Sequence, residues 1–178
     1  MIVSLCGFMG AGKSTIGKHL ARITGYPFID LDHYIEKRVG MSIPEFFKRE
    51  GEEAFRAEEL ASLQEILEGD LSGEDKKEKN LILPLGGGTV TREACATLIK
   101  EKTCCIYLYC NREELARRLR RNSSNRPLLK EKSDTEMEEF IGNLMQQREN
   151  TYICCAKHIV DTAGKRLQDV IEETLNLV

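Results

Sequence analysis

A glycine-rich segment near the start of the chain carries the clearest chemical signal. Residues 7–14, GFMGAGKS, match the G-x-x-x-x-G-K-[ST] phosphate-binding loop and directly follow the apolar residues 2–5. Backbone N–H groups of such a loop bind phosphate oxygens, and the helix that follows points the positive end of its dipole at them. Lys13 is predicted to reach the β- and γ-phosphates, and the Ser14 hydroxyl to ligate Mg²⁺. The segment predicts nucleoside triphosphate binding, against the alternative of a glycine-rich turn that matches by chance.

Two aspartates follow a second β-rich run, residues 27–30. Asp30 and Asp32 are separated by one residue, so both can lie near the phosphates and Mg²⁺. One carboxylate can hold the water shell of the metal, while the other accepts a hydrogen bond from a substrate hydroxyl. The alternative is that Asp32 is simply the N-cap of the helical segment that comes next.

Two further segments could contribute to the same site. Arg56 and Glu59 are three residues apart, hence neighbours on one helix face, and a surface ion pair is the simplest explanation. A third β-rich run ends in Gly86, Gly87 and Gly88. Glycines at a strand end permit a ligand to approach the backbone closely, although a loose turn is the alternative.

Two polar stretches interrupt the pattern. Residues 69–79 are charged and are expected to form a solvated loop without a function. Residues 122–135 follow an arginine-rich helix end and contain Arg126 before Pro127. This second stretch is either a mobile surface loop or a lid that closes over the nucleotide and excludes water.

The elements that must position these residues alternate between strand and helix. The expected helices include a first helix that ends near Gly25, a broken helical region at 43–68, one at 91–102, one capped by Asn111, and a last helix through Leu175. β-Rich runs lie at 2–6, 27–30, 80–85, 104–109 and 158–160. Strands separated by helices predict right-handed crossovers and a parallel α/β sheet with its active site at the carboxyl ends of the strands.

Length and composition fit one domain that spans residues 1–178. The 26 basic and 29 acidic residues give a net charge of −3, so neither nucleic acid nor a membrane is expected as a partner. No apolar run approaches membrane-spanning length. The 7 cysteines include no C-x-x-C pair, which argues against zinc and redox motifs and favours buried thiols in a reducing cytoplasm.

Together these segments resemble the shikimate kinase family. The family pattern comprises the phosphate loop, D-x-D, G-E-x-x-F-R-x-x-E, a G-G-G strand end, R-P-L-L and a late arginine–tyrosine pair. The resemblance runs over the whole chain in the family's order and spacing. In this sequence the pattern corresponds to residues 7–14, Asp30 and Asp32, residues 51–59, residues 86–88, residues 126–129, and Arg148 with Tyr152.

The resemblance implies a three-layer phosphate-loop fold of the nucleoside-monophosphate-kinase group, with a five-stranded parallel sheet of order 2-3-1-4-5. It implies the reaction of ATP with shikimate to give ADP and 3-phosphoshikimate, in chorismate and aromatic amino-acid biosynthesis. Mg²⁺ is the implied cofactor, shikimate and ATP are the partners, and the enzyme is expected to be a cytoplasmic monomer.

The resemblance also implies roles for individual residues. A substrate-binding region covers about 32–60 and a lid about 122–135, and Phe47 and Phe55 either wall the substrate ring or belong to the core. The implied catalytic residues are Lys13, Asp32 and Arg126. The implied ATP contacts are Gly10, Ala11, Gly12, Lys13, Ser14, Thr15 and Arg126; the substrate contacts are Asp32, Arg56, Gly86, Gly87, Gly88 and Arg148; and the metal ligands are Ser14 and Asp30.

Some features depart from the family pattern. Asn150 stands where many members have proline, and Pro84 lies inside the third β-rich run, where its missing N–H should weaken pairing. Either Arg120 or Arg121 could stack on adenine. Two other functions stay open: a kinase for another small polyol or acid such as gluconate, and a nucleotide-binding scaffold that has lost catalysis. A nucleic-acid function for the arginine-rich helix conflicts with the overall charge and the lack of interleaved aromatic residues.

Overall fold

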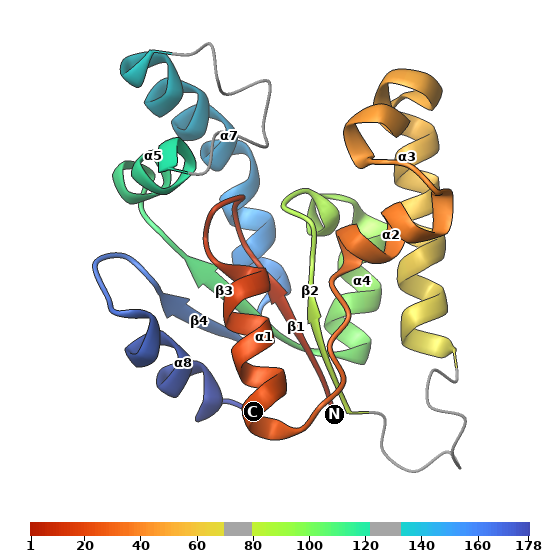
Figure 1. Ribbon diagram of the computed structural model, residues 1–178, viewed down its shortest axis with the longest axis horizontal. Helices are drawn as coiled ribbons and strands as arrows, with labels where there is room; N and C mark the ends of the chain where they lie inside the picture. Colours follow the sequence, from red (N-terminus) through yellow and green to blue (C-terminus); the bar gives the residue numbers. More distant parts are fainter. Residues whose placement is uncertain (70–79, 122–132) are drawn as a thin grey trace.

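The computed structural model describes residues 1–69, 80–121 and 133–178, whose strands form one parallel sheet (Figure 1). The strand order is β2-β1-β3-β4. In the register of the sheet, Leu5 pairs with Pro84 on one side and with Ile106 on the other. The strands are β1 (Ile2–Cys6), β2 (Leu81–Pro84), β3 (Cys104–Tyr109) and β4 (His158–Asp161).

The strand expected at residues 27–30 is reduced to one bridge, so the prediction of five strands was wrong. Phe28 bridges to Ile82 in parallel, and Ile82 N–H donates to the Pro27 carbonyl at 2.9 Å. This segment therefore lies beyond β2, where the order 2-3-1-4-5 places the second strand. It cannot extend further because Pro27 has no N–H to donate and Asp30 already caps the next helix.

Helices cover both faces of the sheet (Figure 1). α1 and α8 pack on one face, and α2, α3, α4 and the end of α7 pack on the other. Strand residues alternate between these two cores, as the period of two requires: Val3 and Leu5 face α1, while Ile2 and Cys6 face the opposite layer. The helices are α1 (Lys13–Thr24), α2 (Leu31–Val39), α3 (Ile43–Glu68), α4 (Glu93–Lys102), α5 (Arg112–Arg121), α7 (Asp134–Cys155) and α8 (Leu167–Leu175), with a 3₁₀ turn η1 (Thr89–Thr91).

Several local predictions are confirmed. Gly25 ends α1 with φ 74°, and the Asn111 side chain accepts from Glu114 N–H at 2.9 Å at the start of α5. α3 is broken at Gly51, where φ is 87°. The helix expected at 91–102 begins instead at Glu93, because η1 takes up the preceding residues.

Other predictions need correction. The ladder continues past Pro84, since Leu85 N–H donates to the Leu5 carbonyl at 2.9 Å. Ile23 of α1 and Leu167 of α8, apolar residues of the first and last expected helices, are 49% and 44% exposed and so do not contribute to the core. All seven cysteines are free, but Cys154 is exposed rather than buried. No described helix has the length and apolar character needed to cross a membrane.

Candidate active site

The phosphate loop connects β1 to α1 at the carboxyl end of the central strand. Gly7 has φ 133°, and a Cβ there would lie 2.6 Å from the carbonyl oxygen of Leu108, so only glycine fits. Lys13, the first residue of α1, donates from Nζ to the carbonyl oxygens of Gly7 at 2.8 Å and Phe8 at 3.1 Å. The lysine side chain therefore lies across its own loop.

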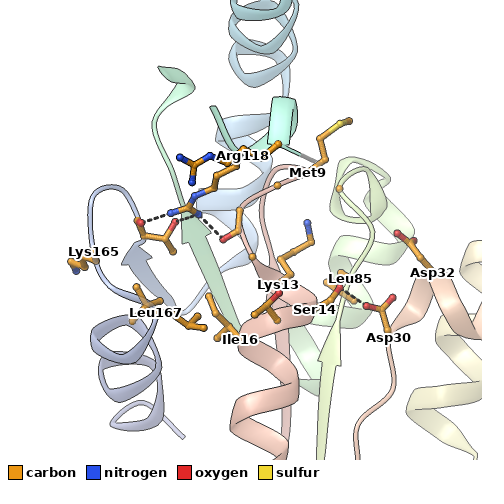
Figure 2. Close-up of a pocket in the computed structure, with 18 residues that line it drawn as sticks. Met9, Lys13, Ser14, Ile16, Asp30, Asp32, Leu85, Arg118, Lys165 and Leu167 are labelled. Atoms are coloured by element: carbon orange, nitrogen blue, oxygen red, sulfur yellow. Dashed lines mark hydrogen bonds between the residues drawn. The ribbon is translucent and has the colours of Figure 1, made fainter. Parts of the chain in front are cut away.

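Ser14 and the two aspartates form the acidic side of this region (Figure 2). Ser14 Oγ donates to Asp30 Oδ2 at 2.5 Å, and Asp30 Oδ1 accepts from His33 N–H at 3.4 Å. Asp30, not Asp32, is therefore the N-cap of α2, which removes the simple capping explanation for Asp32.

Asp32 lies in the first turn of α2, and its Oδ1 is 2.7 Å from the point that a Cβ on Gly86 would occupy. Burial raises the pKa of Asp32 from 3.8 to about 6, and the negative charges of Asp30, Glu59 and Glu36 add to this effect, while Lys13 opposes it. A carboxyl group with that pKa is ionised near neutral pH and can still take up a proton.

The oxygen donors present suit a magnesium ion. The Ser14 hydroxyl and the carboxylates of Asp30 and Asp32 line the same cavity as Lys13. Mg²⁺ prefers such hard oxygens and is commonly bound by one or two carboxylates together with substrate phosphates and water. Within the described ranges, no group of three or more His, Cys, Asp or Glu side chains could hold a metal by itself, so phosphate oxygens would have to complete the coordination.

One cavity of about 630 Å³ joins these groups to a more distant set. In Figure 2, Asp30 and Asp32 lie on one side of Lys13, and Arg118, Lys165 and Leu167 lie on the other. Gly87 and Leu85 also line the cavity. The cavity therefore extends from the two carboxylates past the phosphate loop to Arg118 and Lys165.

Arg118 lines this cavity and was not among the site residues predicted from the sequence. Its guanidinium donates to the Thr162 carbonyl at 2.7 Å and to the Ala11 carbonyl at 3.5 Å, so it ties α5 to the phosphate loop and to the loop after β4. Arg121 also lines the cavity, whereas Arg120 faces Glu138 at 3.8 Å. No local sequence signal separates Arg118 from the neighbouring arginines, because its partner Thr162 is 44 positions away along the chain.

Arg56 is fixed by a buried carboxylate as well as by a longer surface ion pair, in which its Nε lies 3.4 Å from Oε1 of the exposed Glu52. Its Nη1 donates to Glu59 Oε2 at 2.8 Å, and Glu59 is only 1% exposed. The buried Thr89 hydroxyl donates to Glu59 Oε1 at 2.7 Å. Both carboxylate oxygens thus have a strong donor, which compensates the cost of burying the charge.

The glycine loop after β2 is surrounded by these groups. A Cβ on Gly88 would lie 3.0 Å from Arg56 Nη2, and a Cβ on Gly87 would lie 3.4 Å from Met9 N. On the remaining side, Arg148 of α7 donates from Nη1 to the Gly87 carbonyl at 3.4 Å. The loop therefore sits between the two arginines that the sequence singled out.

The aromatic residues beside Arg56 belong to the hydrophobic core or pack against it. Phe55 is 4% exposed and stacks at 4.5 Å, in a tilted arrangement, on the half-buried Phe47. The Arg56 guanidinium lies 5.3 Å above the Phe55 ring. Phe55 thus belongs to the core, as the plainer explanation expected.

The predicted lid at residues 122–135, with Arg126 in it, is only partly covered by the residues that the structure describes. Arg126, and with it residues 122–132 of the predicted lid, lies outside the described residues. Residues 133–135 are not loop: Ser133 is the N-cap of α7, and its hydroxyl accepts from Glu136 N–H. Thr15 is exposed on the first turn of α1 and lines the same cavity as Lys13 and Ser14.

A parallel α/β sheet, a phosphate loop at its central strand and a cavity with paired carboxylates and arginines define an ATP-dependent kinase that acts on a small molecule. The family model for shikimate kinase matches residues 9–178. The chain belongs to the shikimate kinase family.

Individual relatives agree over almost the whole chain. The shikimate kinase of Chlorobium limicola is 41% identical over 177 residues, which cover 97% of this chain and 83% of that protein. The structure of shikimate kinase from Acinetobacter baumannii in complex with shikimate has a TM-score of 0.84 at 34% identity, covering 99% of this chain and 91% of the other. The structure of shikimate kinase from Bacteroides thetaiotaomicron has a TM-score of 0.88 at 30% sequence identity, and the match covers 99% of this chain and 97% of the other.

Proposed function

We propose that this protein transfers the γ-phosphoryl group of ATP to the 3-hydroxyl of shikimate, with Mg²⁺ as cofactor, in aromatic amino-acid biosynthesis. The observation that carries the proposal is the position of the glycine loop 86–88. It adjoins the phosphate loop at Met9, Asp32 at Gly86 and Arg56 at Gly88. An acceptor that lies on this loop is within reach of a phosphate bound beside it.

The substrate side suits a small ring that carries one carboxylate and several hydroxyls. Arg56 and Arg148 supply guanidinium donors from α3 and α7 on either side of the loop, and planar guanidinium groups recognise carboxylates through paired N–H donors. The backbone N–H and C=O groups of the glycine loop and the carboxylate of Asp32 can form hydrogen bonds with the substrate hydroxyls. A substrate without a carboxylate would leave unused the N–H donors that Arg56 and Arg148 do not already direct to Glu59 and to the Gly87 carbonyl.

The phosphate side neutralises the charge that develops during transfer. We assign Lys13 to the β- and γ-phosphates, for which it must exchange its bonds to the Gly7 and Phe8 carbonyls. Ser14 and Asp30 would hold Mg²⁺, which supplies charge neutralisation for the phosphates. Arg126 is proposed to add a further positive charge from the predicted lid.

The chemical step requires positioning more than covalent help. The 3-hydroxyl oxygen forms a bond to the γ-phosphorus while the bond between that phosphorus and the β–γ bridging oxygen breaks, and ADP leaves. Asp32 orients the hydroxyl by accepting its hydrogen bond, and with a pKa of about 6 it can take the proton as the new bond forms. Arg118, Thr162 and Leu167 would hold the adenosine end of ATP.

A coupled ADP-release assay tests the proposal. Purified protein with ATP and Mg²⁺ is given shikimate, gluconate or a nucleoside monophosphate in parallel. Turnover on shikimate that depends on both ATP and Mg²⁺, and exceeds that on the other acceptors, is expected. Equal or greater turnover on gluconate would favour the alternative kinase, and ATP binding without any turnover would favour a scaffold.

The oligomeric state and location remain proposals as well. The monomeric state is proposed from the family resemblance, and the seven free thiols support a reducing cytoplasm. Light scattering on the purified protein would measure the first, and cell fractionation the second.

A further inference from the structure

The Gly87 carbonyl oxygen accepts hydrogen bonds from two residues of α7, Arg148 and Tyr152. Of these two, only Arg148 is assigned to the substrate carboxylate above. Tyr152 donates its hydroxyl to this oxygen at 2.5 Å, whereas Arg148 Nη1 lies at 3.4 Å. The two residues are four apart and therefore share a helix face. The short contact is the stronger of the two, because N–H···O bonds weaken beyond about 3.2 Å.

The Tyr152 hydroxyl is a hydrogen-bond donor whose position is fixed by burial and ring packing. Its side chain is 1% exposed, and its ring packs on that of Tyr107 at 5.1 Å with an interplanar angle of 32°. Burial raises the pKa of Tyr152 to about 12, although the charge of Arg148 and a hydrogen bond with it oppose this shift, so the phenol keeps its proton at any physiological pH. The phenol can therefore donate to the Gly87 carbonyl throughout the catalytic cycle.

We propose that Tyr152 is a positioning residue for substrate binding: by satisfying the Gly87 carbonyl, it leaves the Arg148 guanidinium available for the substrate carboxylate. Without the phenol, Arg148 is the donor on α7 that still reaches this carbonyl. The loop and the substrate would then compete for one cation. The inference rests on the proposed function, because it presupposes a carboxylate that binds Arg148.

Steady-state kinetics of single and double variants test the inference. The KM for shikimate at saturating ATP, and the KM for ATP at saturating shikimate, are measured for wild type, Tyr152→Phe, Arg148→Ala and the double variant. Tyr152→Phe should raise the KM for shikimate about tenfold, the effect of one neutral hydrogen bond, and leave kcat and the KM for ATP nearly unchanged. In the Arg148→Ala background, the same change should alter the KM for shikimate less than about twofold.

Matched variants separate this role from general packing. Tyr107→Phe removes the hydroxyl of the stacked ring but keeps the Tyr152 contact to Gly87, and its KM for shikimate should equal that of the wild type. Where Tyr152→Phe is too unstable to assay, Tyr152→p-aminophenylalanine and Tyr152→p-fluorophenylalanine give the same comparison, with and without a donor on a ring of similar size. The amino variant should retain a low KM for shikimate and the fluoro variant should not.

The possible outcomes distinguish the inference from the proposed function. An equal rise in the KM for shikimate with and without Arg148, or a parallel rise in the KM for ATP, would overturn the positioning role. A Tyr152→Phe enzyme identical to a wild type that phosphorylates shikimate would overturn it too. If the wild type itself does not phosphorylate shikimate, the proposed function fails.

Discussion

Replacing Asp32 by asparagine should lower kcat by about a hundredfold or more and yet make the ligand-free protein more stable. The reason is that Asp32 is kept ionised in a place that disfavours its charge. Burial, together with the charges of Asp30, Glu59 and Glu36, raises its pKa from 3.8 to about 6, although Lys13 opposes the shift. The asparagine side chain has nearly the same shape and never carries that charge.

The size and sign of the effect follow from linkage. Because the pKa is higher in the folded than in the unfolded state, the carboxyl group favours folding when protonated, and this contribution is lost as the pH rises through about 6. A shift of about 2 pKa units corresponds to about 3 kcal/mol of lost free energy of unfolding at pH 8. About 2 kcal/mol of this loss falls between pH 4.5 and pH 8.

Thermal and urea unfolding of the ligand-free protein at pH 8 and pH 4.5 measure the difference. At pH 8 the Tm of the Asp32→Asn variant should be about 6–12 °C higher than that of the wild type. At pH 4.5 the difference between the two Tm values should shrink to about a third of that. Glu53→Gln is the matched control, since Glu53 is exposed on α3, and its stability should follow that of the wild type at both pH values.

Activity supplies the second half of the test. Asp32→Asn should lower kcat by about a hundredfold or more, the usual contribution of a positioned proton acceptor. Wild-type kcat/KM for shikimate should fall below a pH of about 6, because the protonated carboxyl no longer accepts the hydroxyl proton. If the variant is no more stable than the wild type at pH 8, or if the gap is the same at both pH values, the electrostatic account of Asp32 is wrong.

Three further changes probe the rest of the site. Lys13→Ala should lower kcat on the order of a thousandfold while the protein stays folded by circular dichroism, as for other preorganised charge donors; near-normal turnover would refute the phosphate-loop mechanism. Arg56→Ala should weaken shikimate binding, measured by calorimetry, by about 2–5 kcal/mol, and a matching loss of ATP affinity would place this arginine elsewhere. Gly88→Ala should raise the KM for shikimate more than the KM for ATP, because the new methyl group would lie 3.0 Å from Arg56 Nη2; an unchanged KM for shikimate would show that Arg56 can move aside.

The fold class could be predicted from the sequence because its signals are local. Short apolar runs alternate with helical patterns, and the order of the sheet follows from the family resemblance. The number of strands could not be predicted from such signals. Whether residues 27–30 form a strand depends on Pro27, which lacks an N–H, and on Asp30, whose role as helix cap became visible only in the structure.

The site was only partly predictable, since some of its contacts are purely tertiary. An arginine and a glutamate three residues apart look the same on an exposed and on a buried helix face. Only the packing of η1 shows that Glu59 is buried and bonded to Thr89. Arg118 could not be predicted as a site residue for the same reason, because its partner Thr162 is 44 positions away along the chain.

The contacts of the glycine loop also explain why the site requires glycine there. Asp32 comes from α2, Arg56 from α3, Arg148 and Tyr152 from α7, and all of them approach the same short backbone segment. Side chains on this segment would separate those elements and displace the groups that they carry. Since the phosphate loop touches the segment at Met9, a shift of the glycine loop would also change the distance between the acceptor hydroxyl and the phosphate. Substrate affinity and turnover should therefore be coupled through this backbone, even where a substitution leaves every charged group in place.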